Sequence, residues 1–196
     1  MGDIAFFDEV AERWDAMARH PERKLTHILD TLGYMAGKRA LDVGTGTGVL
    51  VPALCERVGP RGFVSAVDLS ANMIAVARRK FSLGNAEFVH GDFCEFRPVA
   101  PYDAVVAYSC YPHFHDKERF FRSVLSCLNP EGLLLIAHSQ SKEEINGIHR
   151  RVEGRVRYGG LAPVGELSAL AAGYGFAELR AEDSAEYYLY LGKKQA

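Results

Sequence analysis

The chain has 196 residues, a length that suits one α/β domain and is sufficient to bury a full core. Hydrophobic residues make up 48% of it and charged residues 24%, as is ordinary for a globular protein, and the net charge of −2 gives no electrostatic reason to expect nucleic acid as a partner. No stretch approaches the roughly 18 apolar residues that cross a bilayer, so stable membrane insertion is not expected. The N-terminus lacks the features of a signal peptide and the four cysteines form no C-x-x-C pair, which together predict a cytoplasmic protein with reduced thiols.

Two helices are expected before the first strand. Apolar residues recur at helical spacing over residues 3–19, and Pro21 ends this segment. Residues 22–35 show a second apolar stripe and form the second predicted helix. Trp14 lies on the apolar face of the first, where it can contact a ligand, although a tryptophan more often anchors its helix to the core.

A glycine-rich stretch, LDVGTGTG at residues 41–48, follows a short buried strand predicted over residues 38–43. A helix is expected to begin at residue 49. A glycine turn between a strand and a helix lets the backbone approach a ligand and presents free helix N–H groups to it. Asp42 precedes the first glycine by two positions, where a carboxylate opposes a diphosphate ligand and favours a cationic one. A degenerate nucleotide loop and a purely structural turn remain the alternatives.

This stretch resembles motif I of the class I S-adenosylmethionine-dependent methyltransferases. S-adenosylmethionine carries an amino group and a sulfonium but no phosphate, which agrees with an acidic residue before the glycines. The resemblance implies that Asp42, Gly44, Thr45, Gly46 and Gly48 bind this cofactor. It also implies that the helices before the first strand cover the cofactor site.

The second strand is predicted over residues 63–68 and ends in Asp68, which lies 22 positions beyond Gly46. A carboxylate about 20 residues after a glycine loop binds ribose hydroxyls in Rossmann-like sheets. The resemblance places Leu69 against the adenosine. The alternative role for Asp68 is that of a helix cap or a surface acid.

The third strand and its exit are predicted over residues 86–93. In the family that the chain resembles, an acidic residue at this point holds the exocyclic amine of adenine, and the next side chain packs on the ring. Asp92 and Phe93 match these two positions. A polar turn at the end of a strand is the alternative.

A fourth strand over residues 103–107 leads into a loop, residues 108–115, that is dense in aromatic and titratable side chains. Ligands of open α/β sheets bind outside the carboxyl ends of the strands. The resemblance places residues near the transferred methyl group and the substrate in this loop. We assign Tyr108 to the cofactor and the catalytic site, His113 to catalysis, and Tyr111 and His115 to substrate.

The chain then continues as a helix after Asp116, a turn at residues 129–132 and a fifth strand over residues 133–138 that ends in His138. The capping box from Ser141 to Glu144 opens a helix that carries His149, which we assign with Trp14 to the substrate. The basic run 149–157 is either a solvated face or a clamp on an anionic substrate, with a hinge at residues 159 and 160. A helix over 164–172 and an antiparallel pair over 176–183 and 186–194 close the chain.

The expected fold is α/β: a Rossmann-like three-layer sandwich with a seven-stranded, mostly parallel sheet, an antiparallel last strand and N-terminal helices over the cofactor site. The resemblance covers about residues 38–192. We predict a single domain over residues 1–196. Its parts are an N-terminal helical cap (1–37), a cofactor-binding half (38–138) and a substrate-side cap with a closing hairpin (139–196).

Methyl transfer from a sulfonium is a direct displacement that needs alignment and a dry site but no covalent enzyme nucleophile. An acceptor that must lose a proton is helped by a base near neutrality, and His113 or His138 suits that role. The segment FFDEVAERWD makes the chain similar to the ubiquinone and menaquinone biosynthesis C-methyltransferases. The loop after the fourth strand lacks the N-P-P-[YFW] signature of amino and nucleobase N-methyltransferases, so a small-molecule acceptor (O, C, S or N) is favoured.

Two alternatives from other classes remain. His113, His115, His138 and His149 could bind a divalent metal, either in a metal-binding protein or in a metal-assisted methyltransferase. The fold could also serve a noncatalytic partner subunit, and the sequence leaves a homodimer open. The complete set of glycines and carboxylates argues against an inactive cofactor pocket.

Overall fold

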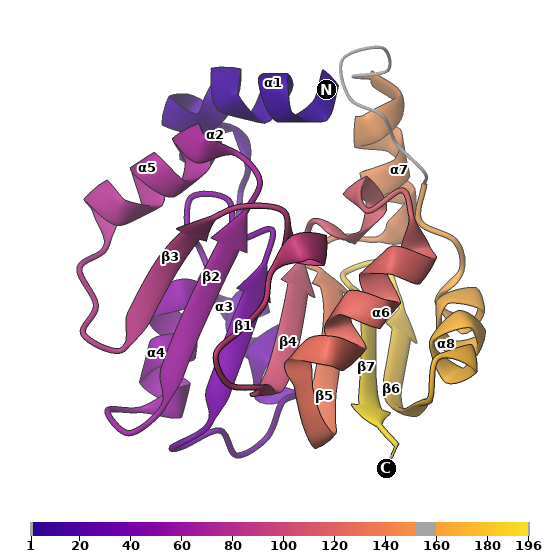
Figure 1. Ribbon diagram of the computed structural model, residues 1–196. Coiled ribbons are helices and arrows are strands. Elements are labelled where there is room, and N and C mark those ends of the chain that lie inside the picture. The colour runs from indigo at the N-terminus through magenta and orange to yellow at the C-terminus, as the bar shows by residue number, and fades with distance from the viewer. Residues whose placement is uncertain (1, 152–159, 196) are drawn as a thin grey trace.

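The computed structural model describes residues 2–151 and 160–195, which form one seven-stranded sheet flanked by helices (Figure 1). The strand order is β3-β2-β1-β4-β5-β7-β6, and β7 is antiparallel to both of its neighbours. The predicted sheet with an antiparallel last strand is therefore confirmed. The strands are β1 (Arg39–Val43), β2 (Phe63–Asp68), β3 (Ala86–His90), β4 (Tyr102–Tyr108), β5 (Leu128–His138), β6 (Phe176–Asp183) and β7 (Tyr188–Lys194).

The predicted three layers arise because the central strands are buried on both sides. Leu41 of β1 and Val105 of β4 face a cluster that includes the aromatic residues of α6, whereas Ala40 and Val106 face a second cluster built on α3 and α4. Strands buried on both faces have nearly continuous apolar sequences, as in RALDV and YDAVVAY. The helices are α1 (Gly2–Val10), α2 (Trp14–Met17), α3 (Glu22–Asp30), α4 (Val51–Val58), α5 (Ala71–Lys80), α6 (Lys117–Cys127), α7 (Lys142–Arg151) and α8 (Val164–Gly173).

The N-terminal helices lie across the edge toward which β1, β2 and β4 point (Figure 1). The single helix predicted over residues 3–19 is wrong in detail: α1 and α2 are separated by a 3-10 turn, η1 (Ala11–Arg13). This break has a packing reason, since Val10 and Ala11 are buried against Met73 and Val76 of α5. The chain therefore bends over α5 instead of continuing straight.

Polar contacts attach this N-terminal cap to the cofactor-side elements. Asp15 accepts hydrogen bonds from Thr47 Oγ1 at 2.5 Å and from Lys80 Nζ at 2.6 Å. Asp8 accepts from Ser70 Oγ at 2.5 Å. These side chains connect α1 and α2 to the glycine loop and to both ends of α5.

Two further boundaries differ from the sequence prediction. The helix predicted over 22–35 ends at Asp30, with Thr31 Oγ1 donating to the carbonyl of Ile28 at 2.6 Å. The turn predicted at residues 129–132 is part of β5, where a register shift between Leu128 and Leu133 accommodates the extra residues. From Leu133 onward β5 pairs regularly with β4, and its side chains there are buried in the core.

The predicted capping box at the start of α7 is confirmed. Ser141 Oγ accepts from the amide of Glu144 at 3.2 Å, and the Glu144 carboxylate accepts from the amide of Ser141 at 3.4 Å. The predicted hinge at Gly159 and most of the basic run 149–157 lie outside the described residues. Within residues 2–151 and 160–195, no helix is long and apolar enough to cross a membrane.

Candidate functional site

A cavity of about 400 Å³ lies at the carboxyl ends of β1, β2 and β4, beneath the N-terminal cap. Small-molecule sites commonly have volumes of roughly 300–1,000 Å³. Most of the predicted site residues line it: Trp14, Asp42, Gly44, Thr45, Gly46, Asp68, Leu69, Asp92, Phe93, Tyr108, His113 and His115. The cavity therefore joins residues from the glycine loop, three strand ends and the N-terminal cap.

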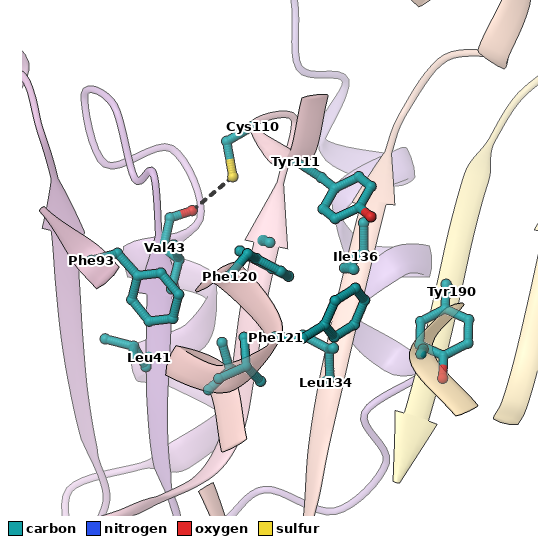
Figure 2. Packing of buried hydrophobic residues seen from close by; sticks show 14 of the residues in the cluster. Leu41, Val43, Phe93, Cys110, Tyr111, Phe120, Phe121, Leu134, Ile136 and Tyr190 are labelled. Carbon is teal, nitrogen blue, oxygen red and sulfur yellow. Dashed lines mark hydrogen bonds between the residues drawn. The ribbon is translucent and has the colours of Figure 1, made fainter. Parts of the chain in front are cut away.

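The glycine loop requires its first glycine for two separate reasons. Gly44 has a φ of +64°, in the left-handed region that side chains disfavour. A Cβ atom at this position would lie 2.7 Å from the Cβ of Cys110, on the loop after β4. The Cys110 thiol also donates to the carbonyl of Val43 at 3.0 Å (Figure 2). The backbone of the glycine loop thus packs against the Cys110 side chain of the loop after β4, beside the cavity.

Asp42 presents a buried carboxyl group to this cavity. Its side chain is 2% exposed, and Oδ2 accepts a hydrogen bond from Thr45 Oγ1 at 2.6 Å. Burial raises the pKa of Asp42 from 3.8 to about 7, although the Thr45 hydroxyl partly counteracts this rise and Asp68 adds to it. A buried carboxyl group with this pKa is stabilised by a ligand that brings a positive charge to it.

Asp68 fixes the glycine loop to the end of β2. Its Oδ2 accepts from the amide of Gly46 at 2.7 Å, and its Oδ1 accepts from the amide of Ser70 at 2.8 Å. Burial raises the pKa of Asp68, while these two amide donors oppose the rise. A carboxylate oxygen has two acceptor sites, so both oxygens keep acceptor capacity for hydroxyl donors of a ligand.

The exit of β3 forms the next wall. Asp92 caps the 3-10 turn η2 (Phe93–Glu95) by accepting from the amide of Cys94 at 2.8 Å. Its other oxygen lies 3.2 Å from Nη2 of Arg119, the α6 residue that lines the same cavity. Asp92 thus acts as the polar turn that we considered as an alternative, yet it still faces the cavity beside Phe93.

The Tyr108 hydroxyl connects three segments of the chain. It lies 2.9 Å from Nδ1 of His20, in the linker between α2 and α3, and 2.7 Å from Oγ of Ser139, just after β5. Burial raises the pKa of Tyr108 to about 12, so its hydroxyl stays protonated at neutral pH. Burial likewise lowers the pKa of His20, so the network is held by neutral hydrogen bonds.

Aromatic side chains of the cap meet the loop after β4 across the cavity. The ring of Phe7 lies edge-on to Trp14 at 5.6 Å and to His113 at 5.2 Å. Trp14 Nε1 would lie 3.8 Å from a Cβ atom placed on Gly46, so the tryptophan covers the glycine loop. Trp14 therefore lines the cavity and also packs against Phe7 of the cap, so its contact with a ligand stays a prediction.

Four predicted residues do not line the cavity: Gly48, Tyr111, His138 and His149. Gly48 faces Phe88 and Phe81, and Tyr111 packs among the buried aromatic residues shown in Figure 2. His138 is 1% exposed, and burial lowers its pKa to about 3, with His113, His149 and Lys117 lowering it further. A histidine with this pKa is a poor proton acceptor at neutral pH.

The predicted metal site is not formed. In the described ranges 2–151 and 160–195, no group of three or more His, Cys, Asp or Glu side chains could hold a metal ion. His113 and His149 do approach each other, with ring centroids 5.1 Å apart, but His115 is exposed on the loop. Zinc requires its ligand nitrogens about 2.0–2.1 Å from one ion, and these four rings do not converge on such a point.

Several residues that line the cavity were not assigned from the sequence, among them His20, Phe7 and Arg119. The helix cap at Asp116 could have identified Arg119. A residue three positions after a cap lies in the first turn of the helix, and here that turn is at the carboxyl edge of the sheet. No local signal identifies His20, because its position depends on how the linker after α2 packs.

Comparison with known proteins agrees with this geometry. A family model described as a methyltransferase domain matches residues 40–132, which contain the glycine loop, Asp68, Asp92 and the loop after β4. The malonyl-(acyl-carrier protein) O-methyltransferase of Acetivibrio thermocellus is 31% identical over 130 residues, or 65% of this chain and 46% of that protein. Over these residues the chain is similar to the S-adenosylmethionine-dependent methyltransferases.

The ubiquinone/menaquinone biosynthesis C-methyltransferase of Vibrio campbellii is 32% identical over 113 residues, or 55% of this chain and 44% of that protein. In both relatives the chain therefore spans less than half of the full length. A solved structure, a chain of the complex between the Haloferax volcanii Trm112 methyltransferase activator and a methyltransferase, has a TM-score of 0.81 at 18% identity. It covers 97% of this chain and 96% of that one, which supports the fold.

Proposed function

We propose that this chain transfers a methyl group from S-adenosylmethionine to a small-molecule acceptor. One observation carries the proposal: one cavity brings a buried carboxyl group, Asp42, and a partly buried one, Asp68, beside a glycine loop together with the aromatic and histidine side chains of a second loop. The first set fits the cofactor and the second set fits an acceptor. The names of the two relatives specify different acceptor atoms, oxygen and carbon. We therefore propose only that the acceptor is a small molecule and leave the acceptor atom open.

The residues present fit S-adenosylmethionine group by group. Asp42 would hold the amino group, since a buried carboxyl with a raised pKa gains most from a nearby cation. Asp68 would bind the ribose hydroxyls through its remaining acceptor sites, and Asp92 with Phe93 would bind the adenine. When bound, the cofactor supplies an electrophilic methyl group on its sulfonium.

The chain's own contribution is alignment, exclusion of water and handling of a proton. The N-terminal cap covers the cavity with Phe7 and Trp14. Of the two histidines considered as bases, we propose His113, because it lines the cavity and contacts Phe7. Tyr108 then acts through its hydrogen bonds to His20 and Ser139, which fix the end of β4.

The test of the cofactor site is calorimetric titration with S-adenosylhomocysteine. We expect micromolar binding, and we expect Asp68→Ala to weaken it at least about tenfold, the loss expected when charge-assisted hydrogen bonds are removed. Asp30→Asn, which alters an exposed carboxylate paired with Arg57, is the matched control. Absence of binding by folded protein would overturn the proposal.

The test of the acceptor side is a screen of small molecules with a labelled methyl donor. For an acceptor that must lose a proton, His113→Asn should lower kcat/KM about 10²–10⁴-fold, the usual contribution of a general base. Binding of S-adenosylhomocysteine should not change. His27→Asn, on α3 and in contact with Tyr187, is the control. Equal activity of His113→Asn and its control would exclude His113 as the base.

A further inference from the structure

Asp8 joins the N-terminal cap to the start of α5. It lies in α1, which packs over α5 (Figure 1). Its Oδ1 accepts hydrogen bonds from Ser70 Oγ at 2.5 Å and from the amide of Asn72 at 3.2 Å. The side-chain amide of Asn72 in turn donates to the carbonyl of Asp8 at 3.0 Å. These bonds hold α1 against the first turn of α5.

The carboxylate of Asp8 completes the cap of α5 from a distant part of the chain. The first amides of a helix have no partner within the helix and carry partial positive charge. Ser70, the local cap residue, accepts from the amide of Met73 at 3.1 Å. Asp8 satisfies the amide of Asn72 and places a negative charge at the helix N-terminus, where it is stabilising. Without Asp8, the start of α5 is held less firmly.

Ser70 connects Asp8 to the carboxylate that we assign to the ribose. The amide of Ser70 donates to Asp68 Oδ1 at 2.8 Å, while its hydroxyl donates to Asp8. Ser70 is buried and lines the same cavity as Asp68 and Leu69. A shift of Ser70 therefore moves a donor that orients the Asp68 carboxylate. Hydrogen bonds weaken steeply when their distance and angle change, so the grip on a ribose hydroxyl depends on this orientation.

The N-terminal cap is attached to the sheet less firmly than the other helices. Val10 and Ala11 form a small apolar cluster with Met73 and Val76, separate from the two larger clusters that fill the core on either side of the sheet. The polar attachments of the cap include exposed ion pairs, such as that of Glu12 with α5. Segments with few buried apolar contacts open at a lower free-energy cost than the core. The contact between Asp8 and Ser70 is therefore one that the chain can make and break while the sheet stays folded.

We propose that Asp8 is a positioning residue for the cofactor: closure of the cap brings its carboxylate to Ser70, which then holds Asp68 in the orientation that binds the ribose. This inference rests on the proposed function, because it concerns the binding of that cofactor. Asp8 does not line the cavity, so it acts through Ser70 and not by touching the cofactor. Because coupling between two equilibria is reciprocal, a cofactor that requires this orientation of Asp68 also stabilises the closed cap.

The experiment compares the binding of S-adenosylhomocysteine and of its 2′-deoxyribose analogue to the full chain by calorimetry. The titrations are run at pH 8 to favour the ionised form of Asp68, since burial raises its pKa and the nearby Asp8 raises it further. We expect the wild type to prefer S-adenosylhomocysteine at least about tenfold, the value of one charge-assisted hydrogen bond. Asp8→Ala should weaken the binding of S-adenosylhomocysteine about tenfold and that of the analogue much less, so that the preference falls to about threefold or below.

Glu12→Gln is the matched control. Glu12 also belongs to the cap, but its carboxylate pairs with Arg79 in the last turn of α5, at the other end of the helix from Ser70. Both affinities of this variant should stay within about twofold of the wild type, as for the loss of an exposed ion pair. Asp8→Asn keeps an oxygen that accepts from Ser70, so its preference should lie between those of Asp8→Ala and the wild type. If Asp8→Ala does not fold, Asp8→Asn serves in its place, and a preference equal to that of the wild type then overturns the inference.

The other outcomes separate this inference from the proposed function. Equal weakening of both ligands by Asp8→Ala, with an unchanged preference, shows that Asp8 only holds the cap in place and overturns the inference. Wild-type affinities in Asp8→Ala overturn it as well. A wild type that binds the two ligands equally also overturns it, because Asp68 then does not hold the 2′-hydroxyl. In these cases S-adenosylhomocysteine still binds and the proposed function stands, whereas failure of the wild type to bind it overturns both.

Discussion

Asp42 should make both the stability of the protein and its affinity for the cofactor depend on pH. Its pKa rises from 3.8 to about 7 in the folded chain because the carboxyl group is buried. This rise corresponds to roughly 4 kcal/mol, since each pH unit is worth 1.36 kcal/mol. The figure is an upper bound of the correct order, because the protein relaxes around a buried charge.

The direction of the effect on stability follows from the raised pKa. Below pH 3.8 the carboxyl group is protonated in both the folded and the unfolded chain. Between pH 3.8 and about 7 the unfolded chain releases the proton and the folded chain retains it, so the free energy of unfolding falls as pH rises. Asp42→Asn removes this titration and should therefore be more stable than the wild type at pH 8, by about 2–4 kcal/mol.

Cofactor binding should show the opposite dependence. A positive amino group beside Asp42 favours the ionised carboxylate, so binding releases a proton wherever the free protein holds one. The affinity for S-adenosylhomocysteine should therefore rise about tenfold between pH 6 and pH 8, with its midpoint near the pKa of Asp42. Asp42→Asn should bind weakly and without this dependence.

Two measurements check this reasoning. Chemical denaturation from pH 4 to pH 8 compares the free energies of unfolding, and calorimetry in buffers of different ionisation enthalpy counts the protons released. Thr45→Val, which removes a hydrogen bond to the Asp42 carboxylate, should move both midpoints to higher pH. A wild-type pH dependence of binding in Asp42→Asn, or a stability relative to the wild type that stays constant between pH 4 and pH 8, would refute the raised pKa of Asp42.

Other substitutions test the surroundings of the cavity. Tyr108→Phe leaves the ring of His20 without its hydroxyl partner and should lower the free energy of unfolding by about 1–2 kcal/mol, measured by denaturant titration; an unchanged value would show that water replaces the hydroxyl. Lys80→Met removes a half-exposed ion pair with Asp15, so it should cost less than about 1 kcal/mol but increase amide exchange in the N-terminal cap. Gly44→Ala should destabilise the fold by about 1–3 kcal/mol, because of the positive φ and the contact with the loop after β4; a melting temperature equal to that of the wild type would contradict the close packing.

The sequence by itself determined that Asp42, the glycines and Asp68 come together. Asp42 and Asp68 lie at the carboxyl ends of β1 and β2, the glycines follow β1, and the carboxyl ends of parallel strands meet at one edge of a sheet. Local hydrophobic patterning therefore sufficed to bring them together. Local patterning also located most strands and the capping box of α7, because each depends on residues close together in the chain, while the order of the strands was expected from the resemblance.

Only the tertiary structure decided which side chains of the acceptor side reach the cavity. Tyr111, just after β4, packs into the aromatic core beside Phe121, and His138, the last residue of β5, is buried with its ring near that of Tyr188. His20 enters the cavity from a linker that carries no motif. The direction of a side chain in a loop or linker is set by packing against residues far away in the sequence, and no local period records that packing.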